Sequence, residues 1–162
     1  MPLAALLLAV VALPVVAACG GSSDEARERT AVLTAEQGRA GVIGIAGELA
    51  AAAQPGAVPT PVRTNGPSPC EDGPAGSVTY TVSLDVGVPA GGEATALERA
   101  EGWLAAGGWQ HARRDAGTDA PSVAAGRDGM NVSVAARRGS GRLIVSVQSD
   151  CLQPPPSAAP VP

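Results

Sequence analysis

The chain has 162 residues, with 45% hydrophobic but only 2% aromatic side chains, and a formal net charge of −4 at pH 7. This length favours a single domain, and the scarcity of large side chains predicts a thin core, because small apolar groups each bury little area. The acidic balance disfavours a nucleic-acid-binding protein, since binding to the phosphate backbone depends on a surplus of basic residues.

An uncharged apolar segment opens the chain, and its residues 3–18 read LAALLLAVVALPVVAA. Its length is at the short limit of a membrane span, about 17–25 residues, and Pro14 interrupts it. A run of this kind, followed at once by small and polar residues, is typical of an export signal that is removed from the mature protein. A retained membrane anchor is the less favoured interpretation.

The last residues of this segment, Val16-Ala17-Ala18-Cys19, resemble the lipobox of bacterial lipoproteins, in which an aliphatic residue and two small residues precede a cysteine. The resemblance is confined to residues 1–23. It implies that residues 1–18 are a lipoprotein signal peptide, that Cys19 carries a diacylglyceryl group and palmitate, and that the chain is anchored at the outer face of the cell membrane. Two acyl chains anchor stably where one is marginal. Simple secretion after cleavage at Ala18 is the alternative.

The two other cysteines form an even pair once Cys19 is assigned to the lipid. In an exported protein, Cys70 and Cys151 are therefore expected to form a disulfide. A metal site is the rival interpretation, but the two cysteines and His111 lack the close spacing of metal ligands. No metal and no cofactor are predicted.

Residues 19–25 are expected to be the lipidated cysteine and a polar tether, and residues 26–54 a helix with a partial apolar face. Glycine recurs at every third position from 38 to 47, and each such residue costs a helix interior about 1 kcal/mol relative to alanine. The stripe is either a smooth surface for a partner or the mark of a weak helix that folds only against a sheet, and we favour the second. Residues 55–76, rich in Pro and Gly, are expected to be a loop ordered by the disulfide.

An α+β core is predicted over residues 77–152. Apolar and polar residues alternate from Val78 to Val88, as in a half-buried antiparallel strand. A helix follows and ends at Gly107-Gly108, and Asp128-Gly129 is a hairpin signal. The expected elements are a strand at 77–88, a helix at 92–106 and strands at 109–115, 122–126, 130–138 and 142–150.

This order predicts an α+β fold, a two-layer sandwich in which the helices pack on one face of a mainly antiparallel sheet and leave the other face free. The helix-strand-helix segment precedes a meander of three or four strands. Residues 153–162 (QPPPSAAPVP) are expected to be a disordered, proline-rich tail.

Arginine accounts for all eleven basic residues, which with the abundance of Ala, Gly and Pro is typical of a GC-rich genome and favours an actinobacterial source. Several arginines fall on the predicted meander and are candidates for contacts with anionic lipid headgroups or wall polymers. The alternative is a solvated sheet face whose charges discourage edge pairing. The candidates are Arg113, Arg137, Arg138 and Arg142.

No catalytic constellation stands out in the sequence. His111 is the only histidine, and no serine or acid beside it completes a triad, since Ser and Thr need an activating base. The sequence therefore favours a membrane-anchored, non-enzymatic interaction module whose partner is an envelope protein or an anionic envelope component. A carrier of a small apolar ligand, which would need an enclosed apolar pocket of several hundred Å³, and an envelope enzyme are the alternatives.

Overall fold

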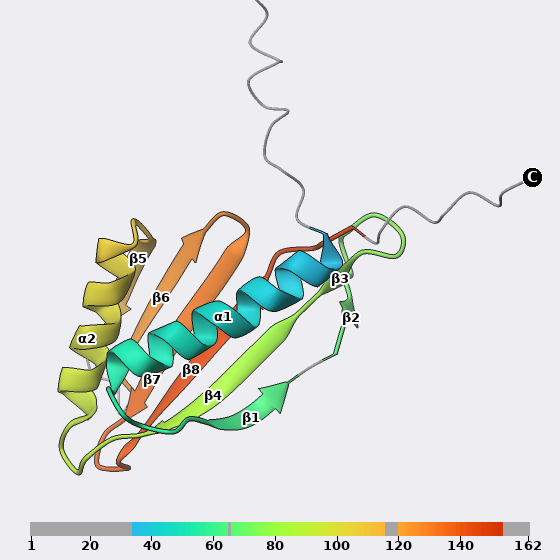
Figure 1. Cartoon of the computed structure of the whole chain (residues 1–162). Coiled ribbons are helices and arrows are strands. Elements are labelled where there is room, and N and C mark those ends of the chain that lie inside the picture. The colour runs from blue at the N-terminus through green and yellow to red at the C-terminus, as the bar shows by residue number, and fades with distance from the viewer. Residues whose placement is uncertain (1–33, 65, 116–119, 154–162) are drawn as a thin grey trace, which may run out of the picture. The chain divides into compact units, whose positions relative to one another are not determined.

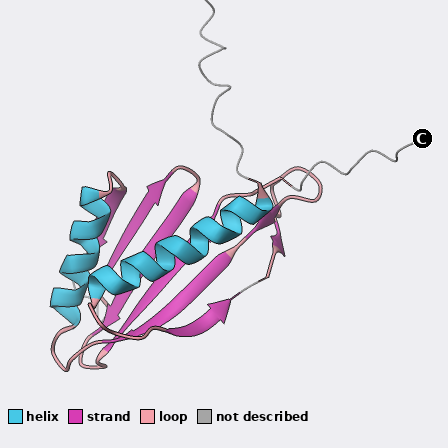
Figure 2. Ribbon diagram, in the orientation of Figure 1, coloured by secondary structure: helices cyan, strands magenta, loops and turns pink. Residues whose placement is uncertain are grey.

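The computed structural model describes residues 34–64, 66–115 and 120–153. Cys19 and the predicted signal peptide, tether and tail beyond Gln153 lie outside these ranges. The described residues form a six-stranded sheet with two helices on one face, so the predicted two-layer α+β sandwich is confirmed (Figures 1 and 2). Within the described residues, no helix is long and apolar enough to cross a membrane.

The main sheet has the strand order β1-β4-β8-β7-β6-β5, and all neighbouring strands in it are antiparallel. The predicted meander is present as its last four strands in the sequence. The helices are α1 (Ala35–Ala53) and α2 (Glu93–Ala106). The strands are β1 (Thr60–Thr64), β4 (Thr81–Gly87), β5 (Gln110–Arg114), β6 (Ser122–Arg127), β7 (Met130–Arg137) and β8 (Arg142–Ser149), and a separate two-stranded sheet pairs β2 (Ser68–Pro69) with β3 (Val78–Thr79).

Helix α1 begins later than the sequence suggested. Thr34 is extended, with ψ 156°, and its side chain accepts a hydrogen bond from the Gln37 backbone, while the Gln37 side chain accepts one from the Thr34 backbone. This capping box fixes the start of the helix at Ala35. Residues 26–33 of the predicted helix lie outside the described ranges.

Helix α2 ends as predicted at the glycine pair. Gly108 adopts a φ of 71°, and the Trp109 amide donates to the Leu104 carbonyl at 3.0 Å while the Gly108 amide donates to Ala105. These two bonds form a Schellman motif, which favours glycine because the left-handed conformation is strained for other residues. The motif turns the chain directly into β5.

The two faces of the sheet differ in the way the alternation predicted. The inner face, which lies under the helices, is lined with small and medium apolar residues that are almost fully buried: Val82, Val86, Val123, Val132, Val134, Leu143, Val145 and Val147. Helix α1 lies over β4 and β8, and α2 over β5, β6 and β7 (Figure 2). The opposite outer face carries Ser83, Ala124, Ser133 and Ser146 at matching register positions.

Two expectations for the loop and the first strand were wrong. The predicted loop 55–76 contains β1, which pairs with β4 and forms an edge of the main sheet. The strand predicted over 77–88 is interrupted at Tyr80, whose amide donates to the Ser149 hydroxyl at 3.0 Å. Pro61 concealed β1 from the sequence pattern, since proline lacks an amide donor and is tolerated only at sheet edges and bulges.

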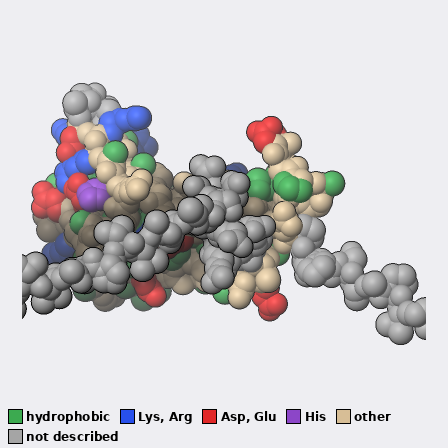
Figure 3. Space-filling view, turned by 90° about the horizontal axis from the view of Figure 1, so that it is seen from above, with side chains coloured by type: hydrophobic (Ala, Val, Ile, Leu, Met, Phe, Trp, Pro, Cys, Tyr) green, Lys and Arg blue, Asp and Glu red, His purple; other side chains and the backbone are tan. Residues whose placement is uncertain are grey.

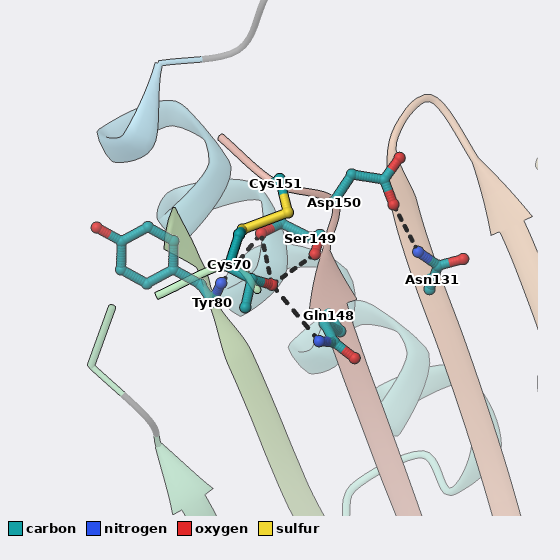
Figure 4. Close-up of a disulfide and its surroundings, with 8 residues drawn as sticks. Cys70, Tyr80, Asn131, Gln148, Ser149, Asp150 and Cys151 are labelled. Carbon is teal, nitrogen blue, oxygen red and sulfur yellow. Dashed lines mark hydrogen bonds between the residues drawn. A yellow bond between two sulfur atoms is a disulfide. The ribbon is translucent and has the colours of Figure 1, made fainter. Parts of the chain in front are cut away.

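The predicted disulfide between Cys70 and Cys151 is present, with Cα atoms 6.0 Å apart (Figure 4). It joins the end of β2 to the chain leaving β8. Directly after it, Leu152 forms a pair of backbone hydrogen bonds with Val78, at 2.8 and 2.9 Å. The cross-link therefore closes the region where the chain enters and leaves the core.

Leu152 also packs into α1. Its side chain is 5% exposed, and a Cβ built on Gly38 would lie only 2.1 Å from the Leu152 Cδ1 atom. Gly44 and Gly47, on the same helix, have nothing within 4 Å of such a Cβ. Of these three glycines, Gly38 alone is required by close packing.

We expect Gly38→Ala to destabilise the protein by about 1–3 kcal/mol, because Leu152 must move out of a filled site. The matched controls Gly44→Ala and Gly47→Ala should stabilise it by about 0.5–1 kcal/mol, because alanine lowers the entropic cost of the helix. Urea unfolding of the three variants measures the difference. Equal effects at all three positions would contradict the close approach of Leu152 to α1.

We expect the double substitution Cys70→Ser with Cys151→Ser to lower the free energy of unfolding. The disulfide spans 81 residues, and the chain-entropy relation gives about 4–5 kcal/mol for such a loop. Urea unfolding without reductant measures the loss, and peptide mapping without reduction identifies the linked peptides. Reductant should destabilise the unsubstituted protein and leave the variant unchanged, whereas an equal response of both would argue against the cross-link.

Candidate functional site

The four arginines singled out from the sequence do not form one patch. Arg137 and Arg142 are cross-strand partners on β7 and β8 and lie on the outer face of the sheet. Arg113 is the cross-strand partner of Val123, which belongs to the buried inner face. Arg138 lines a different hollow together with Arg113, so the structure separates the candidates into two pairs on different sides of the sheet.

The outer-face pair borders a shallow depression of about 300 Å³. Its lining combines Arg137, Arg142 and Ser140 with four apolar residues, Val62, Ala120, Ala135 and Ile144. Arg114 lies on the same face, because it is paired with Ser122 and Ser122 with Ala135. At about 4.8 Å between adjacent strands, Arg114 lies roughly 10 Å from Ala135.

The two arginines of the depression differ in their ion pairing. Arg142 forms an ion pair with Asp85, whose side chain is 9% exposed while that of Arg142 is 64% exposed. Asp85 is thus a largely buried carboxylate on a face that is otherwise open, and removing Arg142 would leave it without its counter-charge. In the described part of the chain, Arg137 and Arg114 have no acidic side chain within ion-pair distance. Among the described residues of the outer face, these two side chains and that of Arg63, which is paired with Ser83, are therefore available to an anionic partner.

On the inner side, Arg113 belongs to a network at the edge of α2. Its guanidinium contacts Glu101 at 2.9 Å and also pairs with Asp115, and the Glu101 hydrogen bond is the main cause of a raised Arg113 pKa. The Nε2 atom of His111 lies 3.7 Å from Glu101. In the view from above, the histidine lies among acidic and basic side chains (Figure 3). The charge of Arg113 is thus balanced internally, and it is not a free anion contact.

A second hollow, of about 380 Å³, lies where α2 begins and is lined by Arg113, Arg138 and Glu93, among others. Glu93 is almost fully buried and accepts a hydrogen bond from the Gly141 amide at 2.8 Å. This bond, which favours the carboxylate, is the main reason why the pKa of Glu93 lies below its ordinary value. Glu93 joins α2 to the β7–β8 hairpin and so has a structural role.

The side chains of His111 and Glu101 bring an imidazole and a carboxylate together. No hydroxyl or thiol in the described part of the chain is bonded to them. Its Nδ1 atom lies 3.2 Å from the Trp109 carbonyl oxygen, and its other nitrogen faces Glu101. In residues 34–64, 66–115 and 120–153, no hydroxyl or thiol is hydrogen-bonded to this imidazole, and no group of three potential metal ligands occurs. Among these described residues, His111 is therefore not placed to activate a nucleophile.

Two features of the site were not anticipated from the sequence. The Asp85–Arg142 pair joins strands that are 57 residues apart in the chain, and only the sheet register brings them together. Glu101, the acid that neutralises Arg113, lies on α2 and is brought to β5 only by the packing of the helix on the sheet. A further hollow, beside α1, involves Tyr80 and Arg39, which the sequence did not single out.

Comparisons with known proteins add no relative for this chain: no family model, no curated protein and no solved structure matches it.

Proposed function

We propose that this chain is a membrane-anchored envelope lipoprotein without catalytic activity, whose outer sheet face binds an anionic polymer of the cell envelope. The lipobox-like residues before Cys19 support the proposed location at the membrane. The outer face, with its unpaired arginines, supports the mode of binding. The observation that carries the proposal is the placement of Arg114 and Arg137, both without an acidic partner in the described ranges, on the face that the helices leave uncovered.

The small side chains at the centre of the outer face suit the binding of an extended polymer. Serine and alanine occupy the centre of four adjacent strands, so no large side chain hinders the close approach of a chain lying across them. Arginine forks match phosphate and carboxylate groups in two-point contacts. Arg114 on β5 and Arg137 on β7 place positive charge on two strands that are separated by β6, which suits repeated negative charges better than a single ion.

The position of the arginines along the strands favours a polymer over the headgroups of the anchoring membrane. Arg142 begins β8, while Leu152, beyond the other end of this strand, contacts α1 near its first turn. The eight residues of β8 span roughly 26 Å. Because the described chain begins at Thr34, directly before α1, the arginines lie at the far end of β8 from that point.

We expect the mature chain to begin at a lipid-modified Cys19. Mass spectrometry of the purified protein should show a diacylglyceryl and acyl mass on its first residue. Cys19→Ser should abolish the modification, because it removes the thiol that accepts the lipid. An unmodified amino terminus in the unsubstituted protein would refute the proposed lipid anchor at Cys19.

We expect the double substitution Arg114→Ser with Arg137→Ser to weaken binding to isolated wall material. Losing two charge-assisted contacts of an exposed type should lower the affinity by about tenfold at low salt. The difference should shrink as salt rises, because exposed charges are screened. Cosedimentation with wall material between low and high salt measures the effect, and urea unfolding checks that stability is unchanged.

The matched control removes two arginines from the helix layer, Arg39→Ser with Arg99→Ser, and should bind wall material like the unsubstituted chain. Vesicles of phosphatidylglycerol form the second arm. Binding to these vesicles that depends on Arg114 and Arg137, with no binding to wall material, would replace the polymer by lipid headgroups. Equal losses in the outer-face variant and the control would show that only net charge matters and would refute the proposed face.

A further inference from the structure

A third hollow, different from the one at the start of α2, lies on the helix side of the sheet along the outer flank of α1. It has a volume of about 340 Å³. We call it the α1 cleft. Three parts of the chain line it: α1, the start of β4 with the residue before it, and Gly66 and Pro67 before β2. Its lining residues are Arg39, Val42, Ile43, Gly66, Pro67, Tyr80 and Val82.

The cleft exists because β1 separates from β4. The register of these strands shifts between Pro61 and Arg63, and the last pair in their ladder is Thr64 with Val82. Beyond this pair the chain turns away toward β2. In the described part of the chain, the edge of the strand that faces away from β8 therefore has no paired strand at Tyr80. Helix α1 overhangs this gap but does not fill it.

Apolar side chains dominate the interior of the cleft. Val42 is fully buried and Val82 nearly so, and both form the floor. Ile43 is 50% exposed and is one of only three large hydrophobic residues exposed in the described part of the chain. Half of its side chain therefore lies uncovered beside an apolar floor, where burial by a ligand would be favourable.

The polar groups of two lining side chains, Arg39 and Tyr80, lack internal partners among the described residues. Within the described ranges, neither the Arg39 guanidinium nor the Tyr80 hydroxyl takes part in a hydrogen bond, and Arg39 has no ion pair. Arg39 is the only charged residue of the lining. Arg39 is exposed and positively charged, so an anionic group is the one whose charge complements this site.

Tyr80 is held rigidly for such a role. Its amide donates to the Ser149 hydroxyl and its carbonyl accepts from the Ser149 amide, both at 3.0 Å. Ser149 is itself 2% exposed and accepts from the Thr79 hydroxyl through its carbonyl at 2.6 Å. Figure 4 shows the Tyr80 ring directed away from the disulfide and from Ser149. These hydrogen bonds fix the Tyr80 backbone, and with it the point from which the ring extends beside the cleft.

We infer that the α1 cleft binds a long-chain carboxylate, with the alkyl chain over Val42, Ile43 and Val82 and the carboxylate at Arg39. The volume falls within the range of about 300–1,000 Å³ that is usual for small-ligand sites. Charge complementarity selects the anionic head, and the open flank of the cleft admits the chain from the surface. This site is on the opposite side of the sheet from the arginines of the outer face and does not depend on their function.

The test uses the full chain in phosphatidylcholine vesicles with a photoactivatable diazirine fatty acid, and cross-linked peptides are mapped by mass spectrometry. We expect labelling of α1 and of residues 78–84, competed by oleate. Arg39→Gln should weaken the labelling by the carboxylate about tenfold, because it removes a charge-assisted contact, and leave labelling by the corresponding fatty alcohol unchanged.

Two further variants make the outcome decisive. Ile43→Ser should reduce labelling by both the carboxylate and the alcohol, since it removes apolar contact area from either chain. Arg99→Gln, on α2, is the matched control and should label like the unsubstituted protein. Labelling outside the cleft, or an Arg39→Gln variant that does not distinguish the carboxylate from the alcohol, would overturn the inference.

Discussion

The close contact of Leu152 with α1 at Gly38 is the constraint on which the rest of this structure depends. Leu152 follows β8, pairs with Val78 and fills the space that Gly38 leaves in the first turn of α1. The neighbouring disulfide holds the same segment to the end of β2. The first helix, the first strands and the last strand are thus fixed at one place, and both the position of Tyr80 and the path of the chain beside α1 follow from it.

The small side chains of the core explain why the protein needs the disulfide and the contact of Leu152 with α1. The buried inner face consists mainly of valine and alanine, with few leucines and a single buried tryptophan, Trp109. Each of these groups contributes little transfer free energy, so a sheet of this size gains less from burial than one lined with aromatic residues. Small residues nevertheless let the helices lie close to the strands. A covalent link and a tight glycine contact compensate for the modest hydrophobic term.

The fold was largely predictable from local patterns, since the strands of the meander alternate clearly and their turns carry strong signals. Asp128 and Gly129 have positive φ values of 49° and 74°, as expected for the type I′ turn that a two-residue hairpin needs. β1 was not predictable, because Pro61 and a register shift remove both the periodicity and the amide that mark a strand. Its place at the edge is set by pairing with β4, which is a long-range interaction.

The candidate site was less predictable than the fold. Alternation along the strands gave no information on which arginines have acidic partners. Glu101 reaches Arg113 from a helix, and Asp85 reaches Arg142 from a strand distant in sequence. Pairing of this kind depends on tertiary packing alone. The sequence therefore identified the right residue type and overestimated the number of arginines available to a ligand.

The Trp103–Trp109 pair has a consequence for spectroscopy. The ring centroids are 6.3 Å apart, and the Arg127 guanidinium lies 5.2 Å from the Trp109 ring. Both indoles belong to the end of α2 and the start of β5, whereas the single tyrosine precedes β4, on the other side of β8 and β7. Tryptophan emission will therefore report on the environment of α2 and its strands, while tyrosine absorbance will report on the region beside α1. The protein carries two intrinsic optical probes that distinguish local opening on the two sides of its sheet.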